Sequence, residues 1–260
     1  MSISVPTSRY VTQICTASIS FIASSTMSII IFKSPKGLNS PYRRIVFGIS
    51  CSDIFQSLAI MLGPFASPND DNGISALIAP WSRGSSTTCA INGFVATNAI
   101  NMVPMYTCSL CIYYLFKLQF RMADDAFRHR VEWMLHLAVF LVNLPISITG
   151  LVLDSFHVSR VGICYYSEYP PGCKTVGNEY YGRCEKGLHS HNFLMQYLIP
   201  VISFLGILLC AAILSRHAFV RTREFRAQSM EPAAGKVPLV DAKPNHEENT
   251  SDLTHPLVEV

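Results

Sequence analysis

The chain has 260 residues, of which 50% are hydrophobic and only 14% are charged. An average soluble domain carries roughly 25% charged residues, so this composition points away from a soluble protein. The net charge of +3 at pH 7 is too small to indicate a nucleic-acid partner.

Five long stretches with few or no charges follow one another along the chain. They predict helices near residues 10–32, 45–66, 89–116, 133–153 and 193–215. About 20 apolar residues, at ~1.5 Å per residue, cross a hydrocarbon core of ~30 Å. The expected fold class is therefore an all-α membrane protein, with a five-helix transmembrane bundle over residues 1–226 that has the lipid bilayer as its surroundings.

The last part of the chain, residues 227–260, changes in character. Prolines and scattered charges replace the apolar residues, and aromatic residues are almost absent. Such a segment cannot bury enough apolar surface to fold, so we predict a disordered tail. Its last residues, Val258–Val260, could bind a PDZ-type groove that captures a C-terminal carboxylate.

Lysine and arginine are concentrated in the loops after the first, third and fifth stretches. These loops contain Lys33, Lys36, Arg43 and Arg44, then Lys117, Arg121, Arg128 and Arg130, and finally Arg216, Arg221, Arg223 and Arg226. Because basic loops favour the cytoplasmic side, we predict a multi-pass plasma-membrane protein with the N-terminus outside and the C-terminus in the cytoplasm. A signal peptide cleaved near residues 21–24 is the alternative, but it would leave the first basic loop outside.

Four cysteines, Cys89, Cys164, Cys173 and Cys184, fall on the predicted outer face. An even number of cysteines in an oxidising compartment indicates two disulfides, with three possible connectivities. A zinc site is the alternative. It would use Cys164, Cys173, Cys184, His189 and His191, whose spacing matches no standard ligand pattern.

The predicted outer loop over residues 154–186 is rich in tyrosine. Its tyrosines are Tyr165, Tyr166, Tyr169, Tyr180 and Tyr181. Two hypotheses fit this pattern, namely a lid over a ligand cavity and an aromatic belt at the membrane interface.

Asp53 is the one acidic residue within the second stretch. A carboxylate at the centre of a membrane helix costs at least ~2.5 kcal/mol to insert, so it should face the bundle interior and find a partner. The candidate partners are Ser50, Ser57, Asn98 and Asn101. The simpler alternative is a carboxylate kept neutral by protonation.

Other polar residues and prolines also lie within the stretches. His136 and Asn143 are seven residues apart and share one helix face. Pro104, Pro145 and Pro200 each free a backbone carbonyl, which is expected to bend the helix that contains it.

These features, in this order, resemble the first five helices of a seven-helix G-protein-coupled receptor of the rhodopsin-like or cyclic-AMP-receptor-like kind. The matching residues are Ser50–Asp53, Cys89, Trp133 with Pro145, a cysteine in the following loop, and Pro200. The resemblance implies that Cys89 is bonded to Cys164, or alternatively to Cys173 or Cys184. It also implies that Asp53 binds a sodium ion, that an extracellular ligand is sensed, and that a G protein or a partner receptor chain receives the signal.

The chain departs from this receptor pattern in three places. Tyr113-Tyr114-Leu115 stands where the family has Asp-Arg-Tyr, and Ser24-Ser25 stands where helix one has an Asn. No stretch after Arg226 predicts helices six and seven. The resemblance therefore favours a truncated receptor-like product, or a chain that needs a partner to complete the bundle.

Two other functions remain as alternatives. A small transporter or channel would use Asp53 with His136 or Asn101 as a polar path through the membrane. An enzyme would need convergent ionisable groups, and the single such cluster is His189, His191 and Glu185. That cluster is weak, so we do not expect an enzyme, and we expect no cofactor beyond the sodium ion.

Overall fold

The structure is a computed structural model, and it describes residues 7–69, 81–159, 162–169, 173, 182 and 190–230. The chain divides into two units, residues 1–218 and residues 219–260. Both units are helical wherever they are described, apart from loops and one small hairpin in the first unit.

Long helices make up most of the first unit. They are α1 (Thr7–Lys33), α2 (Pro41–Ala66), α4 (Ser86–Leu118), α6 (Trp133–Val152) and the beginning of α7 (Ser190–Met230). A short helix, α5 (Asp124–Phe127), and a π-helical turn, η1 (Arg128–Glu132), lead into α6. In the described part of the chain, five helices are long and apolar enough to cross a membrane, which confirms the five predicted helices.

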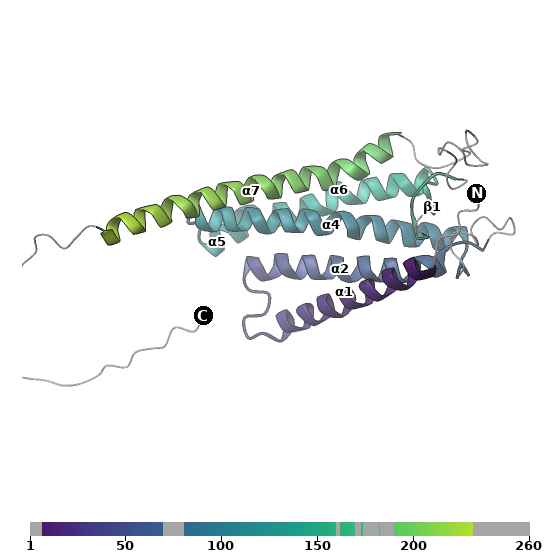
Figure 1. Ribbon diagram of the computed structural model, residues 1–260, viewed down its shortest axis with the longest axis horizontal. Coiled ribbons are helices and arrows are strands. Elements are labelled where there is room, and N and C mark those ends of the chain that lie inside the picture. The colour runs from purple at the N-terminus through teal and green to yellow at the C-terminus, as the bar shows by residue number, and fades with distance from the viewer. Residues whose placement is uncertain are drawn as a thin grey trace, which may run out of the picture. The chain divides into compact units, whose positions relative to one another are not determined.

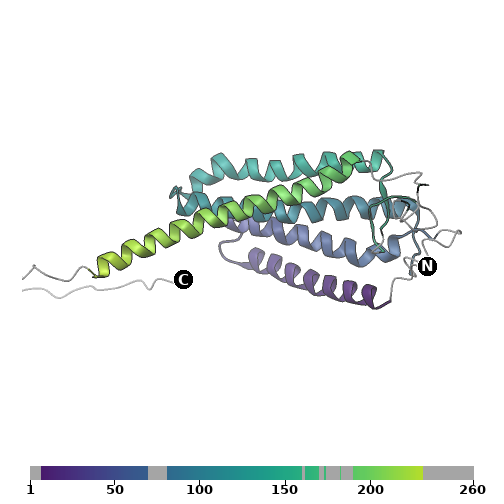
Figure 2. The same ribbon diagram turned by 45° about the horizontal axis from the view of Figure 1, so that its top comes forward.

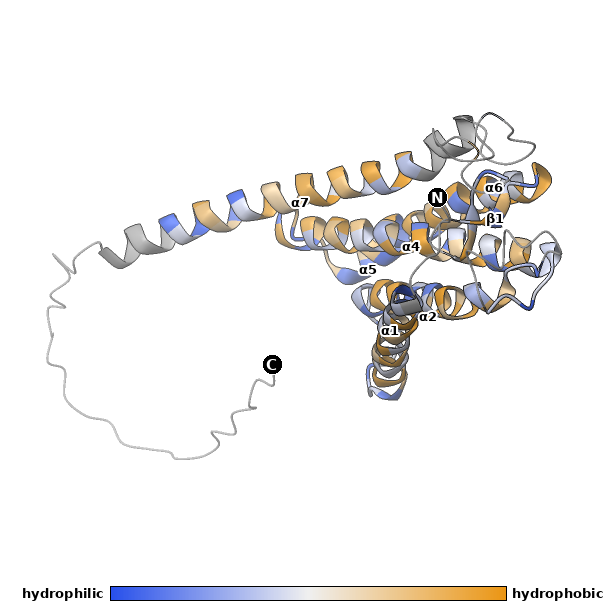
Figure 3. Ribbon diagram, turned by 45° about the vertical axis from the view of Figure 1, so that its right-hand side comes forward, coloured by the Kyte–Doolittle hydropathy of each residue, from blue (hydrophilic) through white to orange (hydrophobic). Residues whose placement is uncertain are grey.

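Helices that follow one another in the sequence also pack side by side. Figures 1 and 2 show this order within residues 1–218: α1 packs on α2, α2 on α4, and α4 on α6. The buried centre of the α2, α4 and α6 group is formed by Ile45, Tyr106, Tyr113, Phe127 and Val139. Figure 3 shows hydrophobic residues along the middle of α7, and many of the hydrophobic side chains of α6 and α7 are exposed in the structure.

Two short strands form an antiparallel hairpin after α6. β1 (Phe156–Val158) pairs with β2 (Cys164–Tyr166), so that Phe156 lies opposite Tyr166 and Val158 opposite Cys164. The hairpin contacts α4 and α2 at the end of the helices where Cys89 lies. We call this the hairpin end, and we call the opposite end of the helices the Arg44 end.

Local sequence signals explain why α2, α4 and the segment before α6 become helical several residues before the apolar stretch begins. α2 begins at Pro41 because the fixed backbone angle of proline suits the first position of a helix. α4 begins at Ser86 because Ser85 and Thr88 form a capping box, in which each side chain accepts a hydrogen bond from the backbone N–H of the other. The segment 124–132, which hydropathy left in a loop, is helical because Asp124 and Asp125 suit the first turn of a helix.

The second unit is described only over Phe219–Met230, the last turns of α7. Within it, the Arg223 guanidinium lies 4.9 Å from the centroid of the Phe219 ring. The fifth helix thus continues well past the predicted end near residue 215, because Arg, Glu and Gln favour helices although they are polar, and Ala favours them most strongly. Residues 231–260, with the proposed Val258–Val260 motif, lie outside the described residues.

Candidate functional site

A disulfide joins Cys89, in the first turn of α4, to Cys164 of the hairpin. Both cysteines are fully buried, together with Val158. Cys173 is also disulfide-bonded, whereas Cys184, His189 and Glu185 lie outside the described residues. The zinc hypothesis that included Cys164 was wrong, because a sulfur held in a disulfide cannot be a thiolate ligand.

Glycines allow the hairpin to lie close against three helices. A Cβ atom added at Gly93 of α4 would lie 2.7 Å from Cδ1 of Phe156, and one added at Gly63 of α2 would lie 2.8 Å from Cγ2 of Ile163. A Cβ at Gly150 of α6 would overlap the hydroxyl of Tyr166. Each of these helices therefore has a small notch into which one large side chain of the hairpin fits.

The hairpin is also held by polar contacts and by α1. Tyr166 is buried, and its hydroxyl donates a hydrogen bond to the carbonyl of Ile146 at 2.6 Å. Burial raises the pKa of Tyr166 to about 12, so the hydroxyl stays protonated and remains a donor at neutral pH. Tyr10 of α1 is 1% exposed and packs against Gly162, whose φ of +75° is readily adopted only by glycine. The tyrosine-rich loop, where it is described, thus covers the helix ends.

Asp53 is paired by α1. Its Oδ2 atom accepts hydrogen bonds from Ser20, at 2.8 Å, and from Ser24. These donors are none of the four candidates, Ser50, Ser57, Asn98 and Asn101. Ser50 and Asn98 donate instead to carbonyls of their own helices. The amide of Asn101 is buried and has no hydrogen-bond partner among the described residues. The partners of Asp53 therefore come from α1 and not from α4.

The residues around Asp53 fit a sodium ion in chemical type. One carboxylate and two hydroxyl oxygens meet at one point between α1 and α2. Hard cations prefer such oxygen ligands, and a hydroxyl that donates to a carboxylate still presents a lone pair. Asp53, Ser20 and Ser24 are thus the residues that would hold the ion.

A buried ion pair lies at the Arg44 end. The Nε and Nη2 atoms of Arg44 donate to the two carboxylate oxygens of Glu132, with an Nη2–Oε2 distance of 2.6 Å. The remaining nitrogen, Nη1, donates to the carbonyl of Leu38 at 2.6 Å. The side chain of Glu132 is only 5% exposed. This two-pronged geometry joins the start of α2 to the π-helical turn that precedes α6.

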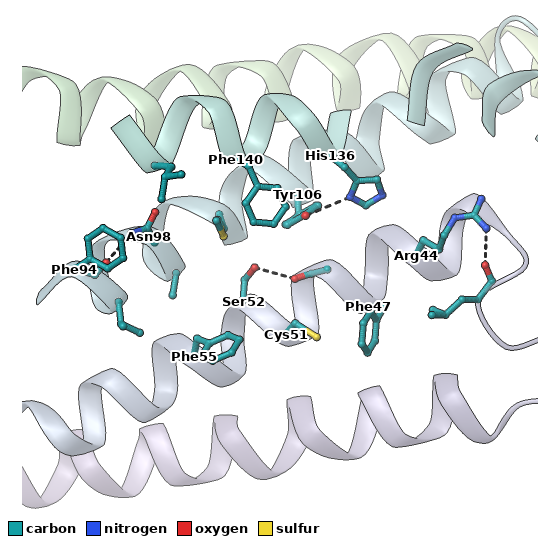
Figure 4. A pocket seen from close by; sticks show the side chains of 16 residues that line it. Arg44, Phe47, Cys51, Ser52, Phe55, Phe94, Asn98, Tyr106, His136 and Phe140 are labelled. Carbon is teal, nitrogen blue, oxygen red and sulfur yellow. Dashed lines mark hydrogen bonds between the residues drawn. The ribbon is translucent and has the colours of Figure 1, made fainter. Parts of the chain in front are cut away.

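His136 extends this ion pair to α4. Its Nε2 atom lies 3.7 Å from Oε1 of Glu132, and its Nδ1 atom shares a hydrogen bond of 3.3 Å with the hydroxyl of Tyr106. Figure 4 shows the side chains of His136 and Tyr106 facing each other, and it shows Arg44 on the neighbouring α2. One turn beyond Val139, Asn143 donates to the carbonyl of Val139 and lies 3.1 Å from the sulfur of Met105 in α4. The shared helix face predicted for His136 and Asn143 is therefore the face that contacts α4.

A second ion pair holds the turn after α4. Lys117 donates to Oδ1 of Asp124 at 2.6 Å, and the Tyr113 hydroxyl donates to the same oxygen at 3.3 Å. Both charged side chains are more than 40% exposed, so the pair contributes about 0–1 kcal/mol.

Sequence reasoning missed Glu132 and the glycines under the hairpin. The available signal for Glu132 was its position four residues before His136, since that spacing places both side chains on one helix face. Trp133, Pro145 and Pro200, to which the sequence assigned only a structural role, all lie in helices. Trp133 is the first residue of α6 and is 56% exposed. Pro145 lies inside α6 and Pro200 inside α7. Both helices continue through their prolines.

Comparisons with known proteins give no independent assignment. No protein family, curated protein or solved structure matches this chain. The function is therefore argued from the contacts of the described residues.

Proposed function

We propose that this chain is a receptor-like integral membrane protein that senses a stimulus at its hairpin end and responds at its Arg44 end. The hairpin end faces the extracellular side of the plasma membrane in this proposal, because the basic loops cluster at the other end. The receiving partner is a G protein or a receptor chain that completes the bundle.

The observation that carries the proposal is the reach of the hairpin. It touches α1 through Tyr10, α2 through Gly63, α4 through Cys89 and Gly93, and α6 through Gly150. A ligand that moves this one element would displace four helices at once. α4 is continuous from Ser86 to Leu118, so such a displacement would reach the other end through one unbroken helix.

The polar groups favour a sensor over a transporter. Asp53 is bound by serines of α1, whereas His136 is bound by Tyr106 and Glu132. No described hydrogen bond links these two groups, and the side-chain amide of Asn101 has no hydrogen-bond partner within the described ranges. A transport path would need its ionisable groups to communicate along one route through the membrane.

Hydrogen exchange tests whether the two ends communicate. In Gly93→Ala the new Cβ displaces Phe156, so the hairpin loses its seat on α4. A sensor predicts faster amide exchange both in the hairpin and in residues 124–132 at the Arg44 end. We expect an increase of about tenfold there, measured by mass spectrometry in lipid nanodiscs.

Gly206→Ala is the matched control, since it makes the same change in α7, where the nearest described atom is the Cys108 sulfur at 3.0 Å. It should leave residues 124–132 unchanged. Faster exchange confined to the hairpin in Gly93→Ala would show a static cap and would count against sensing.

The sodium prediction concerns Asp53. We expect sodium chloride to raise the unfolding temperature of the purified protein above its value in choline chloride at equal ionic strength. Asp53→Asn should abolish that difference, because the amide loses the charge that attracts the ion. Asp125→Asn, which removes an exposed carboxylate of α5, is the control and should retain it. Equal unfolding temperatures of the unchanged protein in both salts would refute the sodium site.

A further inference from the structure

The helical segment of residues 124–152 contains one turn of unusual geometry. Within this continuous helix, η1 (Arg128–Glu132) is π-helical, whereas α5 before it and α6 after it are α-helical. π-helical turns are rare, and they frequently mark functional positions in a helix. This turn lies at the Arg44 end, and its last residue is the Glu132 of the buried ion pair.

Two rows of inward-facing side chains meet at this turn. The first row ends with Phe127, which is 2% exposed and packs against the rings of Tyr113 and Phe116. The second row begins with Glu132, which is 4% exposed, and reaches Val139 two turns later. Phe127 and Glu132 are five residues apart, so in a regular α-helix their side chains would point about 140° apart. The π-turn brings both to the same side, because its hydrogen bonds join residues that are five apart.

The α6 side of the turn is firmly held. Glu132 receives two hydrogen bonds from the guanidinium of Arg44. One turn further on, His136 shares a hydrogen bond with the hydroxyl of Tyr106 in α4. These contacts fix the rotation of α6 about its own axis.

The α5 side is held less firmly. Its buried anchor is the ring of Phe127, and the ion pair between Lys117 and Asp124 contributes little because it is exposed. If residues 124–131 turned by one position, which is about 100°, the whole segment would become a regular α-helix. Phe127 would then leave its pocket, and Arg128 would take its place.

The pocket of Phe127 also suits Arg128. Its walls include the aromatic rings of Tyr113 and Phe116, and the face of such a ring attracts a guanidinium. Arg128 precedes Glu132 by four residues, a spacing at which an arginine and a glutamate pair on an α-helix. A second register of residues 124–131 would therefore be stabilised by contacts of its own.

We propose that the π-turn is a two-position switch, in which residues 124–131 alternate between the observed register and a regular α-helix with Arg128 in the pocket. In the second register the ring of Phe127 is turned out of the core at the Arg44 end. The switch is a property of the fold and does not depend on the sensing function.

Fluorine NMR tests the switch in the full-length protein, with trifluoromethyl-phenylalanine in place of Phe127. We expect a major signal that a soluble gadolinium chelate does not broaden, and a minor signal of about 1–10% that it does broaden. Saturation transfer should link the two signals. A single protected signal without saturation transfer would show a static turn and would overturn the proposal.

Arg128→Ala should lower the minor population about twofold, because it removes the side chain that stabilises the second register. Arg130→Ala is the matched control, since Arg130 is also exposed but lies only two residues before Glu132. It should leave the minor population unchanged. Equal effects of the two substitutions would overturn the proposal, because the minor signal would then report general fraying of the helix and not a second register.

Deletion of His129, an exposed residue of the π-turn, tests the extra residue directly. It leaves Phe127 and Glu132 four residues apart, so a regular α-helix holds both of them inward. The unfolding temperature should stay within about 3 °C of the original value, and the minor NMR signal should disappear. Deletion of Leu141, which is 62% exposed in α6, should instead lower the unfolding temperature by more than about 10 °C, because it rotates the two parts of an α-helix out of register. Equal losses from the two deletions would overturn the proposal.

Discussion

Glu132→Gln is expected to lower the free energy of unfolding by about 3–5 kcal/mol, the largest effect of any single substitution proposed for this chain. The carboxylate is 5% exposed and holds the guanidinium of Arg44 through both of its oxygens. Glutamine retains one acceptor but removes the charge, so Arg44 remains cationic and partly buried without compensation. Chemical unfolding of the protein in detergent micelles measures the loss.

The exposed pair of Lys117 and Asp124 provides a matched control within the same protein. Its two charges are also close, at 2.6 Å, but their side chains are 43% and 42% exposed. Asp124→Asn should therefore cost less than about 1 kcal/mol. Equal losses from the two substitutions would contradict the argument, because burial would then not decide the strength of the pair.

A double substitution separates the energy of the pair from the penalty of an unpaired charge. Arg44→Met with Glu132→Leu removes both charges and keeps apolar volume at the joint between α2 and α6. We expect it to be more stable than Glu132→Gln alone, since replacing a buried pair by apolar residues is often close to neutral. A double variant less stable than the single one would instead show that the hydrogen bonds themselves hold the joint.

The helices could be predicted from hydropathy, but their ends could not. A window of apolar residues reveals a membrane-length helix because the bilayer requires one. The ends of the helices depend on other signals, such as the proline at Pro41, the capping box at Ser85 and the helix-forming residues after Arg216. These signals act in polar segments, where hydropathy carries no information.

The polar site illustrates the limit of reasoning from one helix. The sequence correctly marks Asp53 as the residue that needs a partner within the second helix. Its partners come from α1 because α2 turns this residue toward α1 rather than toward α4. Such a rotation is set by packing between helices, which a single stretch of sequence does not encode.

The hairpin could be predicted even less well. Its tyrosines and cysteines fitted both a lid and an aromatic belt at the membrane interface. Neither hypothesis located the positions on the helices against which the hairpin packs, which are Gly63, Gly93 and Gly150. A glycine within an apolar helix is common in membrane proteins and does not by itself indicate what fits against it. Only the three-dimensional contacts show that each one receives a side chain of the hairpin.

Loss of the Cys89–Cys164 disulfide is expected to have the second large effect. The two cysteines are 75 residues apart in the sequence, and closing a loop of that length stabilises a protein by about 4 kcal/mol in the chain-entropy account. The double variant Cys89→Ala with Cys164→Ala should lose most of this stability and loosen the hairpin from α4.

Reduction of the unchanged protein gives the same comparison without a substitution. Under mild reductant its unfolding midpoint should fall toward that of the double variant, whereas the midpoint of the double variant should fall less. Cys15→Ala is the control, because Cys15 is an exposed free thiol in α1 and should have little effect in either condition. If reductant cleaves the Cys89–Cys164 bond but leaves the unfolding midpoint of the unchanged protein where it was, then the glycine seats hold the hairpin on their own and the disulfide does not stabilise it.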